Sequence, residues 1–189
     1  MSGYAAKRFV ASAPEAQVKG QIVLSFLENI ESALVAPRLP KYSLEQVDPD
    51  GWYSQQTWLN VLSELDTLPG MQMTLVAIGR KAMEHSVWPP NITTLPEAMK
   101  MMGMAHHMNF RNVPQEEGFK VVEKGPNHLW LYQNTPESPD AAYGLLWGLA
   151  ARFKSADETF VVRMMDNPAP EEIPGNLFEV KWGPKNAKL

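Results

Sequence analysis

The sequence predicts an α+β fold: a helical half, then a four-stranded antiparallel sheet of two hairpins joined by a crossover helix. Two observations support this. Apolar residues recur at helical spacing up to about residue 112 and alternate as in strands after Pro114. A single amphipathic stretch, residues 139–153, separates the two strand pairs. This order is typical of α+β domains whose helices cover one face of an antiparallel sheet.

The first half is expected to contain helices at residues 21–36, 54–66, 71–85 and 95–110. In the first of these, Ile22, Phe26 and Ile30 repeat every four residues, which predicts one amphipathic helix of about four turns. The last begins with Thr94 and Glu97, the spacing of a capping box. Prolines and turn residues separate the four segments, so each helix is expected to end where the next connection begins.

The second half reads as hairpin, helix, hairpin. Residues 118–134 form two alternating runs around a Lys-Gly-Pro-Asn turn, and two further strands are expected at 159–166 and 176–182. Ser138 caps the helix between the hairpins, with proline at the first helical position. Gly144 and Gly148 lie four residues apart on that helix, which predicts a strip where another backbone approaches closely.

The length of 189 residues indicates one domain. We expect it to span residues 19–183, with a helical half at 19–112 and a hairpin-helix-hairpin half at 113–183. Residues 1–18 are expected to form a flexible N-terminal arm, and residues 184–189 a tail.

Composition excludes several classes of site. The chain has no cysteine, so disulfides, iron–sulfur clusters, thiolate zinc sites and cysteine nucleophiles are ruled out. A net charge of −4 without a basic run argues against nucleic-acid binding. No apolar run approaches the roughly 18–20 residues of a membrane helix, and the N-terminus does not resemble a signal peptide. We therefore expect a cytoplasmic protein without membrane insertion.

No sequence motif names a reaction. The chain lacks the P-loop, GxGxxG, GxSxG and HExxH patterns, which favours a non-catalytic domain and leaves an enzyme as an alternative. His106 and His107 are adjacent on a predicted helix, where successive side chains diverge, so the two cannot readily share a metal. A zinc site assembled from distant residues stays an alternative. The pairs 116–117 and 171–172, all glutamates, are interpreted as solvated loop residues.

An apolar ligand pocket is the functional site that the composition favours, because such pockets are mostly apolar with a few polar groups. It would be built from the helix before the first hairpin, that hairpin and the crossover helix. Its candidate lining residues are Met102, His106, Trp130, Tyr143 and Trp147. Each of them could instead be an ordinary core residue.

Three segments carry a resemblance to a known superfamily. Residues 143–153, YGLLWGLAARF, resemble the crossover helix of the haem nitric oxide/oxygen binding (H-NOX) domains, and LPEAMKMMGMAHH resembles their proximal helix. NLFEVKW is similar to the closing hairpin. The 4-vinyl reductase-type hydrocarbon-binding domains and the Bet3-like trafficking subunits are relatives of this superfamily. The resemblance covers residues 21 to 182 and implies the fold expected above.

By this resemblance, His106 falls on the haem-ligating histidine, so the resemblance implies haem as a candidate cofactor. The family also carries a Tyr-x-Ser-x-Arg motif whose arginine holds the haem propionates. The motif can be aligned with this sequence in two ways that differ by one residue. One places Leu131, Gln133 and Thr135 on its three fixed positions, and the other places Tyr132, Asn134 and Pro136 there. Neither alignment supplies an arginine. The cysteines of the vinyl-reductase-type relatives are also missing.

The sequence is therefore interpreted as a divergent, non-haem member of this superfamily, a non-catalytic domain that binds a small apolar ligand or acts in sensing or interaction. No cofactor is predicted. One alternative is a haem-dependent NO/O2 sensor with His106 as its proximal ligand. Another is a structural or assembly module that forms a homodimer, as Bet3-like domains do, or binds a signalling partner. A weaker alternative, which the name of a related family implies, is an enzyme acting on a tetrapyrrole or hydrocarbon.

Overall fold

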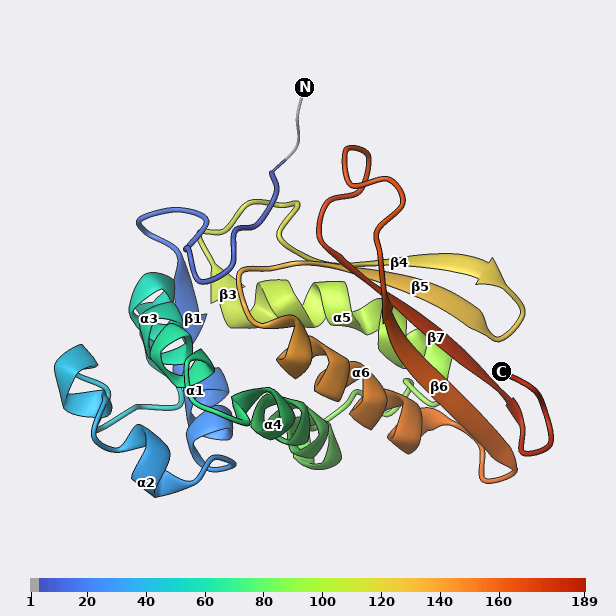
Figure 1. Ribbon diagram of the computed structural model, residues 1–189, viewed down its shortest axis with the longest axis horizontal. Helices are drawn as coiled ribbons and strands as arrows, with labels where there is room; N and C mark the ends of the chain where they lie inside the picture. The colour runs from blue at the N-terminus through green and yellow to red at the C-terminus, as the bar shows by residue number, and fades with distance from the viewer. Residues whose placement is uncertain (1–3) are drawn as a thin grey trace.

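The computed structural model describes residues 4–189, apart from the side chain of His85. It confirms the α+β class: the first half is mainly helical, and the second half holds two strand pairs with a helix between them (Figure 1). The helices are α1 (Gly20–Leu27), α2 (Ser32–Val35), the 3-10 helix η1 (Leu39–Tyr42), α3 (Gln55–Asp66), α4 (Met71–His85), α5 (Leu95–Asn109) and α6 (Pro139–Phe153). The strands are β1 (Gln17–Lys19), β2 (Trp52–Ser54), β3 (Phe110–Arg111), β4 (Gly118–Gly125), β5 (His128–Asn134), β6 (Glu158–Met165) and β7 (Asn176–Pro184).

The segment 21–36 is not the single helix that its spacing predicts. It divides into α1 and α2, because the chain leaves the helix at Asn29. The side-chain amide of Asn29 donates to the carbonyl of Ser25, and its backbone N–H donates to the carbonyl of Phe26. Such local bonds offer the backbone an alternative to the helical ladder, and hydrophobic spacing does not register them.

The large sheet has four antiparallel strands in the order β4-β5-β7-β6. Val122 pairs with Trp130 in the first hairpin and Val162 with Val180 in the second, and β5 joins the hairpins through β7. Helix α6 covers one face, where Leu146 belongs to the same buried cluster as strand residues such as Leu131, Phe178 and Val180. The predicted arrangement of hairpin, crossover helix and hairpin is confirmed.

Helices α4 and α6 pack with their backbones close together. A Cβ atom built on Gly144 would lie 2.2 Å from the carbonyl oxygen of Val76, and one on Gly79 would lie 2.4 Å from that of Ala141. Only glycine allows this approach, so the close contact predicted from the glycine spacing on α6 is confirmed. The contact joins the helical half to the half that contains the large sheet.

A small three-stranded sheet, in the order β2-β1-β3, was not expected from the sequence. Val18 pairs with Tyr53 on one side and with Phe110 on the other. Strands of three and two residues are too short to show an alternating pattern. This sheet ties the start of the chain to the end of α5, which is where His106 lies.

None of the helices in the described part of the chain is both long and apolar enough to cross a lipid bilayer.

Candidate functional site

Helix α5 positions His106. The helix begins at the predicted capping box, in which the side chains of Thr94 and Glu97 each bond to the other's backbone N–H. From that start, Met102 and His106 lie one turn apart on the buried side, whereas His107 is exposed. The two adjacent imidazoles therefore have different surroundings, as the helical geometry predicted.

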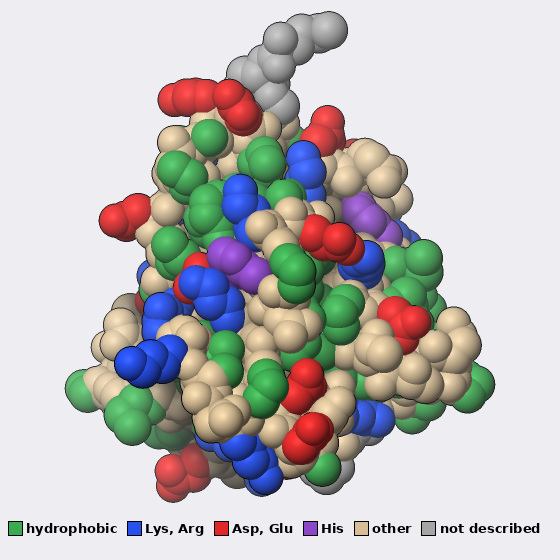
Figure 2. Space-filling view, turned by 90° about the vertical axis from the view of Figure 1, so that its right-hand side faces the viewer, with side chains coloured by type: hydrophobic (Ala, Val, Ile, Leu, Met, Phe, Trp, Pro, Cys, Tyr) green, Lys and Arg blue, Asp and Glu red, His purple; other side chains and the backbone are tan. Residues whose placement is uncertain are grey.

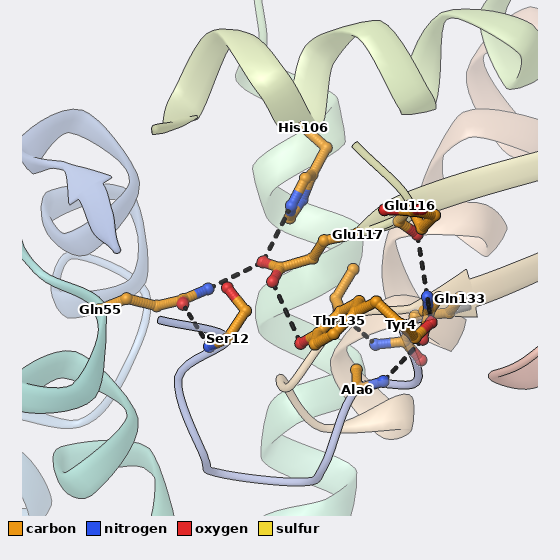
Figure 3. A network of polar contacts seen from close by, with 10 residues as sticks. Tyr4, Ala6, Ser12, Gln55, His106, Glu116, Glu117, Gln133 and Thr135 are labelled. Carbon is orange, nitrogen blue, oxygen red and sulfur yellow. Dashed lines mark hydrogen bonds and ion pairs between the residues drawn. The ribbon is translucent and has the colours of Figure 1, made fainter. Parts of the chain in front are cut away.

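His106 takes part in a buried polar network with Glu117, Gln55 and Tyr4 (Figure 3). Its Nε2 lies 3.2 Å from Oε1 of Glu117, whose side chain is 0% exposed. The same oxygen accepts a hydrogen bond of 2.9 Å from the side-chain amide of Gln55, and the Tyr4 hydroxyl donates to Oε2 at 3.2 Å. The imidazole also stacks on Phe110, with ring centroids 4.4 Å apart. Side chains from α5, α3 and the N-terminal segment thus enclose one carboxylate.

The network favours a charged Glu117 and a neutral Glu137 nearby. Burial alone would raise the pKa of Glu117, but the hydrogen bonds from His106 and Gln55 lower it below the usual value. Burial, and then the charge of Glu117, raise the pKa of Tyr4. Burial also raises the pKa of Glu137, whose Oε1 is buried without a hydrogen-bond partner among the described residues. The pKa values of two buried carboxyl groups close to one imidazole are therefore shifted in opposite directions.

The N-terminal arm crosses the end of the large sheet beside this network. Asn134 holds it there: its side-chain oxygen accepts from Ala6 N–H at 2.8 Å, and its amide donates to the carbonyls of Tyr4 and Glu116 at 2.9 Å. The sequence predicts a flexible arm over residues 1–18. In the described residues this segment contributes a hydroxyl to the buried site, and residues 1–3 of the expected arm lie outside the described residues.

A pocket of about 900 Å³ opens next to the network. It lies between the exposed side of α5, strand β4 and the connection from β6 to β7, and Tyr4 and Glu117 belong to its wall. Its apolar lining is Met104, Met108, Phe119, Val121, Ile173 and Pro174. Its polar and charged side chains include Tyr4, His107, Glu116, Glu117, Lys120, Tyr132, Asn134 and Glu172. The pocket is open and amphipathic, so it can hold a molecule with both an apolar body and polar groups.

The five residues predicted to line an apolar pocket do not meet in one place. Met102 and His106 lie together on the buried side of α5. Trp130 lies on the face of the sheet that α6 does not cover, because its neighbours on β5, Leu129 and Leu131, point into the core. The ammonium of Lys124 lies over its ring, with Nζ 4.1 Å from the ring centroid. Tyr143 and Trp147 are half-buried on α6. None of the five lines the large pocket, which is on the other side of α5 from the core.

Sequence reasoning missed the carboxylate that organises the site. The interpretation of Glu116 and Glu117 as solvated is wrong for Glu117, which is 1% exposed. The loop before β4 gives no periodic signal that would reveal its burial. Gln55 did carry a signal: it lies three and seven residues before Trp58 and Leu62, on the apolar side of α3, where a polar residue needs a buried partner.

The residues around His106 do not fit a haem. The Nε2 atom that faces the interior is held by Glu117, and one face of the ring is covered by Phe110. Gly118 lies close to the ring, since a Cβ atom there would be 3.4 Å from Cδ2 of His106. At the end of β5, where the resemblance places a propionate-binding arginine, the nearby buried ionisable group is the carboxyl of Glu137. Within the described residues, no three His, Cys, Asp or Glu side chains come together as a metal site.

Comparison with solved structures identifies the fold. An H-NOX protein from work on haem distortion superposes with a TM-score of 0.62 at 15% identity, covering 90% of this chain and 97% of the other. The Fe(II) unliganded H-NOX protein from K. algicida gives a TM-score of 0.61 at 14% identity, covering 90% and 100%. A further similar structure, from work on the molecular mechanism of H-NOX activation, gives 0.60 at 14% identity, covering 90% and 96%.

The fold of this chain is therefore H-NOX-like, as the sequence resemblance predicted. No protein-family model matches the sequence. No curated protein matches it either. Identity of this level shows the fold alone, and a fold does not specify a function.

Proposed function

We propose that this chain is a haem-independent ligand-binding module with an H-NOX-like fold, which takes a small amphipathic molecule into the pocket between α5, β4 and the β6–β7 connection. The observation that carries the proposal is the bond between His106 and Glu117. The carboxylate is bonded to the imidazole nitrogen that would coordinate the haem iron. An open pocket of about 900 Å³ lies directly beside this pair.

The lining of this pocket supports a ligand of mixed character. Phe119, Val121 and Ile173 offer apolar contacts, and Tyr132 and Asn134 offer hydrogen-bonding groups. Pockets with a largely apolar wall and a few polar groups are the usual form of small-molecule sites.

The test is to purify the protein from haem-replete cells and to examine it by absorption spectroscopy and native mass spectrometry. We expect a protein without a Soret band and a bound small molecule seen as added mass. Met108→Trp should fill the pocket and remove that mass. Met73→Trp is the matched control, because Met73 is 80% exposed on α4, away from the pocket.

Two results would overturn this proposal. A Soret band that disappears in His106→Ala would establish the haem-dependent alternative. If no small molecule from the extract or from a fragment screen saturates the protein, or if Met108→Trp and Met73→Trp behave alike, the pocket is not the ligand site. The same spectra report the oligomeric state, so a dimer without ligand would favour the assembly-module alternative.

A further inference from the structure

Helix α5 carries its methionines in two groups. Met99 and Met102 are buried in the core, whereas Met104 and Met108 are 61% and 65% exposed. His107, also exposed, lies three residues after Met104, and Met108 lies four residues after Met104, so His107 and Met108 diverge from each other but both flank Met104. Residues three and four apart on a helix are neighbours, with Cβ atoms about 5–6 Å apart. Met104, His107 and Met108 therefore form one exposed group of donors, which we call the thioether–imidazole group.

All three side chains of this group border the pocket beside α5. In the described part of the chain, His107 makes no side-chain hydrogen bond, and its ring only meets that of His106 edge to face, with centroids 5.4 Å apart. Methionine has three rotatable bonds, so two thioether sulfurs can turn toward one imidazole nitrogen without moving the helix. A helix face of this composition can place two sulfur donors and one nitrogen donor around a single small ion.

We propose that Met104, His107 and Met108 bind a monovalent soft metal ion, Cu(I), at the wall of the pocket. Thioether sulfur is a soft donor that selects Cu(I), and imidazole is a common copper ligand. Hard divalent ions prefer oxygen donors, and zinc sites use thiolate, imidazole and carboxylate groups, so neither matches a set with two thioethers. This site shares Met104, His107 and Met108 with the wall of the proposed ligand pocket, but it depends on their sulfur and nitrogen donors and not on apolar contact.

The charge of the pocket wall favours a cation. Glu116 and Glu172 contribute two exposed carboxylates to the wall and Lys120 one exposed ammonium, so these three residues carry 1 − 2 = −1. A singly charged ion at the thioether–imidazole group is therefore attracted by the surrounding field, although salt screens the exposed part of this effect.

The experiment is an anaerobic titration of the full chain with Cu(I) against a chromophoric Cu(I) chelator, with Ag(I) as a redox-inert second probe. We expect one tight equivalent, and Met104→Leu and Met108→Leu should each weaken it about tenfold or more, since tenfold corresponds to only about 1.4 kcal/mol. Leucine keeps the apolar contact area and removes the sulfur. With methyl-labelled methionine, Ag(I) should shift the methyl signals of these two residues selectively in NMR spectra.

Met73→Leu is the matched control, because Met73 is an exposed methionine without a neighbouring histidine, and it should leave the affinity unchanged. His107→Gln tests the nitrogen donor and should also weaken binding. The inference is wrong if the double variant Met104→Leu/Met108→Leu binds Cu(I) as the unaltered chain does, or if Zn(II) binds at the same place with equal affinity. Loss of Cu(I) binding in a variant that still binds its small molecule would separate this site from the proposed ligand function.

Discussion

Glu117 and His106 are paired inside the protein, with Oε1 of the carboxylate 3.2 Å from Nε2 of the imidazole. Neither side chain is more than 4% exposed, so the pair interacts with little screening by water. It joins the end of α5 to the start of β4, and it is connected to α3 through Gln55 and to the N-terminal arm through Tyr4.

Glu117→Gln should destabilise the fold. The amide keeps the shape of the side chain but loses the charge that His106, Gln55 and Tyr4 surround, and hydrogen bonds to charged groups contribute about 1.5–3 kcal/mol. We expect a loss of that order in the free energy of unfolding, measured by urea denaturation at pH 7. Glu116→Gln is the control, because Glu116 is exposed and should change stability by less than about 0.5 kcal/mol. If both variants lose the same free energy of unfolding, the buried charge of Glu117 does not stabilise the fold.

Stability should fall in acid because of Glu117. Its pKa is lowered in the folded state, so its contribution is present above the unfolded-state value of about 4.3 and is lost as the pH drops through the folded value. Unfolding curves of the unaltered chain between neutral and acidic pH should show this loss, and Glu117→Gln should show less of it. An identical pH dependence in both proteins would contradict the assignment.

Glu137 should act in the opposite direction. Burial raises the pKa of this carboxyl, so folding favours the protonated form and the stability from this group is lost as the pH rises through the folded value. Glu137→Gln removes the ionisation, and we therefore expect a gain in stability relative to the unaltered chain at pH 8 and little difference near pH 4. Thermal unfolding at pH 8 and at pH 4 measures the difference in stability between the variant and the unaltered chain. A variant that is less stable than the unaltered chain at pH 8 would exclude this interpretation.

Gly144→Ala should separate α4 from α6. The new methyl group would meet the carbonyl of Val76, and backbone cannot move aside as a flexible side chain can. Overpacking of this kind costs about 1–3 kcal/mol, which lowers the midpoint of thermal unfolding. Gly125→Ala is matched to it, because no atom lies within 4 Å of a Cβ there, and its midpoint should stay nearly unchanged.

Asn134→Ala should release the N-terminal arm. The variant loses the bonds to Ala6, Tyr4 and Glu116, so the segment around Lys7 should become a better substrate for trypsin. Mass spectrometry of short digests would show faster cleavage after Lys7 or Arg8. Asn176→Ala, which removes a single bond to Gln133, should be cut at the same rate as the unaltered chain.

The elements that sequence reasoning located well are those whose burial follows a period. α5 and α6 have caps and apolar stripes, and the alternation in β4–β5 and β6–β7 made the two hairpins visible. The break at Asn29 and the strands β1 to β3 depend on single hydrogen bonds and on two or three residues, which no periodicity reveals.

The candidate site was predictable only in part. His106 could be assigned to the buried side of α5 from helical phase and from the resemblance, but its partner Glu117 comes from a loop whose path is set by tertiary contacts. Trp130 shows the converse difficulty: an aromatic residue in an alternating strand indicates burial on one of two faces, and the strand pattern does not say which face meets α6.

No single area of like charge dominates the face of the molecule shown in Figure 2, where acidic, basic and hydrophobic side chains are interspersed. Such a face gives little long-range steering of charged ligands, so recognition on this side depends on local chemistry.

Tyr4 belongs both to the wall of the pocket and to the network around Glu117. A molecule that contacts this ring in the pocket also favours the docked position of the first residues of the chain. By reciprocal linkage, whatever holds the beginning of the chain in place raises the affinity of the pocket by the same factor. Under the proposed function, a change that loosens the segment around Tyr4 therefore lowers the occupancy of a site whose other walls come from elements far along the sequence.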